Sequence, residues 1–215
     1  MIDSVLLPWA GRALGPLARF VAARGIEADH ITIAGFIVGV LALPALAFGF
    51  WGTALVLILV NRLADGLDGA VARLGQPTDR GAFLDIALDF VFYALVPLGF
   101  ALHDPAANAL PAAVLIASFA GTGSSFLAFA TIAGKAGITT PKYPTKGIYY
   151  LGGLTEGFET IAIFVLMCLF PGAFPVLAYV FAAACAVTTV LRWRQGWIAF
   201  GDGRWPSVDE RPDHE

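Results

Sequence analysis

The 215-residue chain is too hydrophobic to be a soluble domain. Hydrophobic residues make up 58% of it, charged residues only 13%, and the mean hydropathy is +0.77. Soluble domains carry roughly 25% charged residues, so this chain has too few polar side chains to cover the surface of a soluble domain. It is also too apolar to be a disordered protein. The net charge of −3 gives no electrostatic basis for binding nucleic acid. The composition therefore predicts an all-α integral membrane protein.

The first 30 residues precede the long apolar stretches and predict an amphipathic helix. Its apolar residues recur at helical spacing, and its arginines lie between them: Leu6, Leu7, Ala10, Leu14, Leu17 and Val21, with Arg12, Arg19 and Arg24. Such a helix is expected to lie on the cytoplasmic leaflet, with the arginines near anionic headgroups. Residues 1–30 are therefore predicted to be a juxtamembrane segment.

Residues 31–196 are predicted to cross the membrane six times, since one crossing needs about 20 mostly apolar residues. Glycines and prolines divide the uncharged stretches, notably at Gly49, Gly52, Pro105 and Pro171. The expected spans are residues 31–48, 53–72, 82–102, 109–132, 153–170 and 175–194. Residues 197–215, rich in Pro, Asp and Glu, are expected to form a polar cytoplasmic tail.

The basic residues predict the orientation of this six-span arrangement. All 13 lysines and arginines fall on one side of it, and the opposite loops have none. The positive-inside rule makes that side cytoplasmic. We therefore expect a multi-pass protein of the cell (inner) membrane with both termini in the cytoplasm.

Four aspartates lie where a membrane protein rarely carries charge, at the cytoplasmic ends of the second and third spans. Asp65 and Asp68 are three residues apart and Asp85 and Asp89 four apart, so each pair shares one helix face. A short connector makes the two spans antiparallel neighbours, which brings the four carboxylates together. Such a cluster favours hard divalent cations, Mg²⁺ or Mn²⁺. The alternative is a cluster neutralised by nearby arginines, namely Arg62, Arg73 and Arg80.

Small residues lie beside these acids and leave room for a bulky ligand. They are Gly66, Gly69, Ala72 and Gly81, and Arg73 follows Ala72 directly. An arginine can bind phosphate oxygens through its planar fork of donors. Metal ions, small residues and an arginine together indicate a site that handles a diphosphate, on the cytoplasmic side.

The complete pattern resembles the signature of the CDP-alcohol phosphatidyltransferases (CDP-alcohol phosphotransferases). It has eight matching residues at fixed spacing over 25 positions: Asp65, Asp68, Gly69, Ala72, Arg73, Gly81, Asp85 and Asp89. The resemblance implies a six-helix enzyme that joins a CDP-activated alcohol to a second alcohol and releases CMP. It implies a pair of metal ions at Asp65, Asp68 and Asp85, with Asp89 in contact, and Asp89 as the base for the acceptor hydroxyl. It also implies a CDP pocket shaped by Gly69, Ala72, Arg73 and Gly81, together with Thr32 near the start of the first span.

The resemblance leaves the substrates open. Arg73 and Gly81 are separated by seven residues, where eight is commonest in the family, and Phe-Val-Phe-Tyr-Ala-Leu-Val-Pro follows Asp89. This run has neither the lysine typical of glycerophosphate-type members nor the Ser-Phe-Gly run of serine-type members. The leading hypothesis is transfer from CDP-diacylglycerol to a small polar alcohol, in phospholipid biosynthesis. The alternatives are transfer from CDP-choline or CDP-ethanolamine to diacylglycerol, an intramembrane prenyltransferase, and a cation- or proton-coupled transporter.

Further polar residues are candidates for binding the acceptor. Glu156 and Glu159 either line the acceptor pocket or lie at the start of the fifth span because their negative charge stabilises the positive end of its helix dipole. Lys135, Lys142 and Lys146 either hold an acceptor phosphate or are ordinary cytoplasmic loop charges. The resemblance and the small residues of the fourth span, such as Gly121 and Gly123, also predict a homodimer.

Overall fold

The computed structural model describes residues 14–75, 77–135 and 154–201, and every regular element within them is a helix. The helices are α2 (Ala28–Val40), α3 (Ala42–Ala47), α4 (Trp51–Ala72), α5 (Asp79–His103), α6 (Pro105–Lys135), α7 (Gly157–Leu169) and α8 (Phe174–Gly201). A 3₁₀ helix, η1 (Pro171–Ala173), joins α7 to α8. Residues 14–22 are also helical. The all-α prediction is confirmed for this part of the chain.

Four segments are long and apolar enough to cross a membrane: Ala28–Ala47, Asp79–His103, Pro105–Lys135 and Pro171–Gly201. The 22-residue α4 has a suitable length but carries three charged residues in its C-terminal half, Arg62, Asp65 and Asp68. The 13 residues of α7 span about 20 Å, which is short of the ~30 Å hydrocarbon core. The membrane architecture is thus supported, and the number of six crossings remains a prediction.

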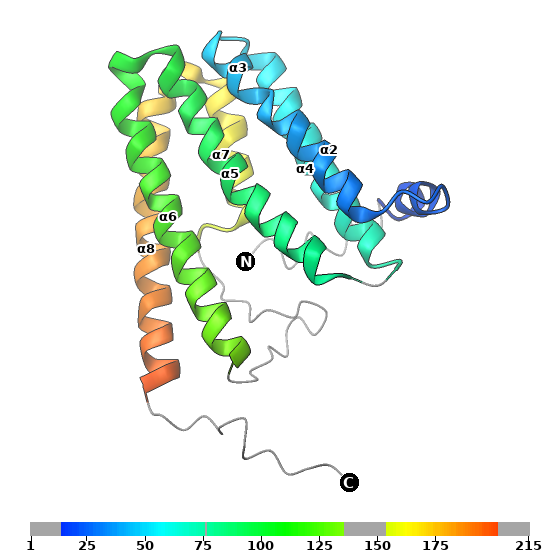
Figure 1. The fold of residues 1–215 in the computed structure, drawn as a ribbon. Helices are drawn as coiled ribbons and strands as arrows, with labels where there is room; N and C mark the ends of the chain where they lie inside the picture. Colours follow the sequence, from blue (N-terminus) through cyan, green and yellow to red (C-terminus); the bar gives the residue numbers. More distant parts are fainter. Residues whose placement is uncertain (1–13, 76, 136–153, 202–215) are drawn as a thin grey trace.

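In the bundle, α2 packs on α4, α5 on α6, and α6 on α8. Apart from α3, which continues in the direction of α2, successive helices from α2 to α8 run in opposite directions, so α6 and α8 are parallel (Figure 1). As a result α2 and α5 begin, and α4, α6 and α8 end, at the same end of the bundle. We call this the basic end, because Arg73, Arg80 and Lys135 lie there. The two signature helices α4 and α5 are antiparallel, as predicted, but they do not pack closely on each other: both pack on α2, and their signature residues meet across a pocket.

The turn between α3 and α4 falls where glycines were expected to interrupt the first long apolar stretch. Gly49 has φ = +76°, a left-handed conformation that glycine adopts without a Cβ clash. The N–H of Phe50 donates to the carbonyl of Ala45 (2.8 Å), and the N–H of Gly49 to that of Leu46 (2.9 Å). These two hydrogen bonds end α3, and the chain then reverses its direction and enters α4.

An aromatic core fixes α5 against the helices that follow it. Phe100 of α5 stacks on Phe174 of α8 with ring centroids 4.4 Å apart. Phe119 of α6 meets Phe164 of α7 and Phe181 of α8 edge to face, at 6.2 and 6.3 Å. These rings are fully or largely buried. The packing leaves another face of α5 directed toward α2 and α4, where the acids lie.

The predicted division of the chain is only partly covered by the structure. The helix over residues 14–22 packs through Ala18 against Ala70 and Val71 near the end of α4. α8 continues to Gly201, so residues 197–201, which we expected in the tail, are helical. The rest of the tail, residues 1–13, and Lys142 and Lys146 lie outside the described residues.

Candidate active site

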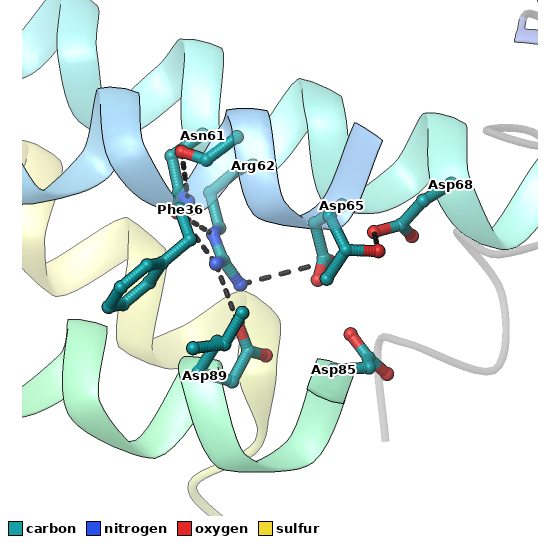
Figure 2. A pocket seen from close by; sticks show the side chains of 10 residues that line it. Phe36, Asn61, Arg62, Asp65, Asp68, Asp85 and Asp89 are labelled. Atoms are coloured by element: carbon teal, nitrogen blue, oxygen red, sulfur yellow. Dashed lines mark hydrogen bonds and ion pairs between the residues drawn. The ribbon is translucent and has the colours of Figure 1, made fainter. Parts of the chain in front are cut away.

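The four signature aspartates line one pocket between α2, α4 and α5 (Figure 2). The pair Asp65 and Asp68 therefore does face the pair Asp85 and Asp89, as predicted. The lining residues are Thr32, Gly35, Phe36, Asn61, Arg62, Asp65, Asp68, Asp85, Leu88 and Asp89. Asp65 lies 14 residues after Trp51, about 21 Å along α4 from the end opposite the basic end. That depth places the acids toward the basic side of the bilayer.

Asp65, Asp68 and Asp85 form the part of the pocket that fits a metal ion. One carboxylate oxygen from each lies within 4.8 Å of the other two. Oxygens on opposite sides of a bound Mg²⁺ are about 4.2 Å apart, so small side-chain rotations would complete such a site. The donors are all hard oxygens, which suits Mg²⁺ or Mn²⁺. The residues present therefore fit the divalent ion that the sequence pattern predicts.

Thr32 orients one of these three carboxylates. Its hydroxyl lies 2.5 Å from Oδ2 of Asp68 and donates to it. Asp68 is 6% exposed, so this hydrogen bond satisfies a largely buried oxygen. Thr32 was predicted to help bind CDP. It lies on the second turn of α2, beside the three carboxylates that could hold a metal ion.

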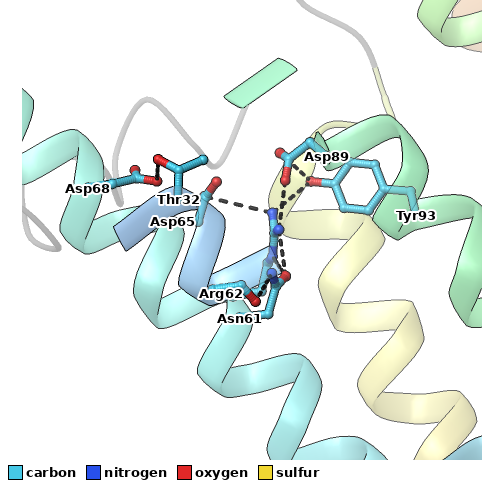
Figure 3. A network of polar contacts seen from close by, with 8 residues as sticks. Thr32, Asn61, Arg62, Asp65, Asp68, Asp89 and Tyr93 are labelled. Atoms are coloured by element: carbon cyan, nitrogen blue, oxygen red, sulfur yellow. Dashed lines mark hydrogen bonds and ion pairs between the residues drawn. The ribbon is translucent and has the colours of Figure 1, made fainter. Parts of the chain in front are cut away.

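Asp89 faces the same pocket but belongs to a different set of contacts (Figure 3). Nη2 of Arg62 donates to Oδ1 of Asp89 at 2.7 Å. The hydroxyl of Tyr93, one turn later on α5, donates to Oδ2 at 3.5 Å. Asp89 is not part of the three-carboxylate group.

Arg62 is the pocket residue that the sequence analysis misplaced. We counted it among the 13 basic residues of the cytoplasmic side and named it as one of three arginines near the acids. In the structure it lies halfway along α4, and its side chain, 14% exposed, points into the pocket (Figure 3). Besides the bond to Asp89, its Nη1 approaches Oδ2 of Asp65 at 3.7 Å. Of the three arginines that could neutralise the carboxylates, Arg62 is thus the one that lies among them. The sequence indicated this position, because Arg62 comes three residues before Asp65 and so shares its helix face.

The other residues predicted to bind CDP lie nearer the basic end and do not line this pocket. A Cβ at Gly69 would lie 3.3 Å from Nη1 of Arg73, so the arginine folds over this glycine. A Cβ at Gly81 would lie 2.9 Å from Oδ1 of Asp29. Asp29 in turn accepts a 2.6 Å hydrogen bond from Nε of Arg80. Ala72 is the last residue of α4.

The predicted acceptor residues are not gathered at the pocket as the structure describes it. Glu156 and Glu159 form a capping box: the Glu156 N–H donates to the Glu159 carboxylate at 3.1 Å, and the Glu156 carboxylate accepts the Glu159 N–H. The box satisfies backbone donors at the start of α7. Lys135 is exposed at the end of α6.

The sequence matches the CDP-alcohol phosphatidyltransferase family over residues 26–191. The chain belongs to this family. It is 54% identical to the inner membrane protein YnjF of Escherichia coli over 198 residues, which are 92% of this chain and 96% of that one. It is 37% identical to the phosphatidylinositol phosphate synthase of Streptomyces avermitilis over 106 residues, 47% of this chain and 43% of that one.

Two crystal structures of the phosphatidylinositol phosphate synthase of Mycobacterium tuberculosis share the fold. The one with CDP-DAG bound has a TM-score of 0.70 at 22% identity and covers 94% of this chain and 100% of its own. The one with manganese and citrate has a TM-score of 0.65 at 24% identity and covers 86% and 88%. The family membership makes this chain a phosphatidyltransferase, a membrane enzyme of phospholipid biosynthesis. It removes the transporter and prenyltransferase alternatives.

Proposed function

We propose that this enzyme transfers a phosphatidyl group from CDP-diacylglycerol to the hydroxyl of a small polar alcohol and releases CMP. The observation that carries the proposal is the single pocket in which three carboxylates fit a divalent ion while a fourth faces the same space. The relatives add support, because one similar enzyme is a phosphatidylinositol phosphate synthase and a structural neighbour holds CDP-DAG.

Asp65, Asp68 and Asp85 would hold divalent ions, Mg²⁺ or Mn²⁺, and the family resemblance implies two. Bound there, divalent ions neutralise the diphosphate and stabilise the departing phosphate of CMP. Thr32 keeps Asp68 oriented for this task. The presence of manganese in a neighbour of the same fold is consistent with such a site.

Asp89 is proposed as the base for the acceptor hydroxyl. It lies one turn beyond Asp85 on α5, so it can reach an acceptor on the far side of the metal-binding carboxylates. The proton of the attacking hydroxyl passes to the Asp89 carboxylate as the new phosphate ester bond forms. Gly69, Ala72, Arg73 and Gly81 remain our candidates for holding CDP at the basic end.

The acceptor and the assembly complete the proposal. Glu156 and Glu159, with Lys135, Lys142 and Lys146, remain candidates for the acceptor side. We propose six crossings of an inner membrane, with the pocket and both termini on the cytoplasmic side and the helix over residues 14–22 at the membrane surface. Similarity to an inner membrane protein supports the location. We also propose a homodimer formed through the membrane helices.

The test is CMP release by the purified protein. CDP-diacylglycerol is incubated with Mg²⁺ or Mn²⁺ and single alcohols, for example glycerol 3-phosphate, an inositol phosphate, inositol, serine and glycerol. We expect CMP release and a new phospholipid with one alcohol, and loss of both on adding EDTA. A reaction without alcohol measures hydrolysis. CMP release from CDP-choline plus diacylglycerol, with none from CDP-diacylglycerol, would show that the donor assignment is wrong.

A further inference from the structure

The two halves of the carboxylate site lie on helices that have little direct contact with each other. Asp65 and Asp68 belong to α4, Asp85 and Asp89 belong to α5, and each of these helices packs on α2 rather than on the other. Carboxylates of like charge repel one another, so the two pairs tend to move apart unless a positive group lies between them. The spacing of the site therefore depends on whatever links α4 to α5 at this depth.

Arg62 of α4 reaches across the pocket to α5. Its Nη2 donates to Oδ1 of Asp89 at 2.7 Å, and its Nη1 donates to the hydroxyl of Tyr93 at 3.3 Å (Figure 3). The same Nη1 lies 3.7 Å from Oδ2 of Asp65. Arg62 is 11 residues after Trp51, about 17 Å along α4, and a charge at this depth is costly and usually serves a function. One guanidinium thus contacts a carboxylate from each helix.

The guanidinium of Arg62 is itself held by the helix on which α4 and α5 both pack. Oδ1 of Asn61 accepts from Nε (2.8 Å) and Nη2 (2.6 Å) of Arg62. Nδ2 of Asn61 donates to the carbonyl of Gly35 on α2 at 2.9 Å. Asn61 fits there because α2 has no side chain opposite it: a Cβ at Gly39 would lie 2.8 Å from Nδ2 of Asn61. The ring centroid of Phe92 on α5 lies 4.8 Å from Cζ of Arg62, so residues of three helices fix its direction.

These contacts give Arg62 a task that the eight signature residues do not perform. We propose that Arg62 is a positioning residue that joins the two halves of the metal site: it links Asp65 of α4 to Asp89 of α5 and holds the carboxylates together before metal ions bind. Each of these two carboxylates keeps a second oxygen that can turn to a metal ion, so the link is compatible with metal binding by all four aspartates. The inference rests on the proposed function, which gives the metal site its meaning.

The first test separates the shape of the guanidinium from its charge. Arg62→Lys keeps the positive charge but replaces the planar fork by an ammonium that cannot reproduce the contacts to Asn61 and Asp89. The Kd of the purified full chain for Mn²⁺ is measured by electron paramagnetic resonance without lipid substrate. It should rise about tenfold, a usual effect of losing a group that orients metal ligands. Arg24→Lys, at an exposed arginine outside the pocket, is the matched control and should leave the Kd unchanged.

An unchanged or lower Kd in folded Arg62→Lys would overturn the proposal, because a role of Arg62 as charge alone would survive this change. If Arg62→Lys does not fold, Asn61→Ala is measured instead. It releases the guanidinium from α2 without changing any charge, and the Kd should rise in the same direction. An unchanged Kd in Asn61→Ala would then overturn the proposal.

The second test measures the separation of α4 and α5 directly. Spin labels are attached at Leu63→Cys on α4 and Val91→Cys on α5, both at exposed positions, while Cys168 and Cys185 are buried. Double electron–electron resonance gives the distances between the labels, with the labelled protein diluted in unlabelled protein. With Arg62 present, we expect one narrow distribution with or without Mg²⁺. In Arg62→Gln the distribution should broaden and lengthen without Mg²⁺, and saturating Mg²⁺ should restore it.

This rescue by Mg²⁺ distinguishes positioning of the carboxylates from general support of the fold. A distribution in Arg62→Gln that stays broad at saturating Mg²⁺ would show that Arg62 only stabilises helix packing, and one that never broadens would show that it holds nothing apart from itself; either result overturns the proposal. Absence of CMP release together with Mn²⁺ binding by the wild-type protein would refute the proposed reaction and leave this inference standing. Absence of Mn²⁺ binding by the wild-type protein would overturn both.

Discussion

Asp85 and Asp89 lie one turn apart on α5, yet their surroundings differ. Asp85 shares the three-carboxylate group with Asp65 and Asp68, whereas Asp89 is bound by Arg62 and Tyr93. A base must accept a proton, and a metal ligand must only offer an oxygen. Replacing each carboxylate by an amide is therefore expected to impair different properties of the enzyme: turnover at Asp89 and metal binding at Asp85.

We expect Asp89→Asn to lower turnover by about 10²–10⁴-fold, the usual effect of losing a positioned base, while binding of Mn²⁺ and CDP-diacylglycerol persists. Asp85→Asn should lose Mn²⁺ affinity and, with it, CDP-lipid affinity. CMP release and the two binding constants are measured for both variants. If Asp89→Asn keeps near-normal turnover, another residue is the base, and Glu156 and Glu159 are the next candidates.

The sequence was sufficient for the aspartates but not for Arg62. Side chains three or four positions apart on a helix share a face whatever surrounds them, so spacing predicts that Asp65 lies with Asp68 and Asp85 with Asp89. The short connector between the two helices then predicts that the two pairs meet. The direction of Arg62 depends on contacts from another helix, through Gly35 and Asn61, that spacing does not encode. A count of basic residues by side of the membrane therefore treated it as a loop charge.

At the scale of helices, the sequence predicted where elements lie better than how closely they pack. The turn at Gly49 and the positions of α4, α5 and α6 agree with the expected spans to within a few residues. α7 also lies within its expected span of residues 153–170, but its 13 residues are fewer than one membrane crossing needs. Close packing of α2 on α4 depends on Gly35 and Gly39, which the pattern of apolar residues does not distinguish from any other apolar position.

This packing predicts the effect of adding one methyl group to α2. A Cβ at Gly39 would lie 2.9 Å from a ring carbon of Phe92 and 2.8 Å from Nδ2 of Asn61, so Gly39→Ala must displace buried groups. Overpacking of this kind costs about 1–3 kcal/mol, and we expect a thermal midpoint several degrees lower in detergent. Gly52→Ala on α4 is the matched control, since nothing lies within 4 Å of its Cβ position. An unchanged midpoint for Gly39→Ala would show that α2 and α4 pack less tightly than described.

At the scale of the molecule, the alternating helices make one end of the bundle basic and leave the other nearly uncharged. Arg73, Arg80 and Lys135 lie at the basic end, and the turns at the opposite end contain no lysine or arginine in the sequence. The four aspartates lie toward the basic end of the same helices. The orientation of the bundle in the membrane therefore decides from which side a water-soluble acceptor and CMP reach the pocket.

The positive-inside rule predicts that the basic end faces the cytoplasm, and two matched alanines allow a direct test. Ala23 follows the helix over residues 14–22, Ala106 lies on the first turn of α6 at the opposite end, and both are exposed. In intact cells a membrane-impermeant maleimide should label Ala106→Cys and spare Ala23→Cys, and after permeabilisation it should label both. The wild-type chain is the blank, because Cys168 and Cys185 are buried. The reverse labelling pattern would place the pocket toward the outer face, away from the cytoplasmic nucleotide pool, and would refute both the orientation and a CMP-releasing reaction on the cytoplasmic leaflet.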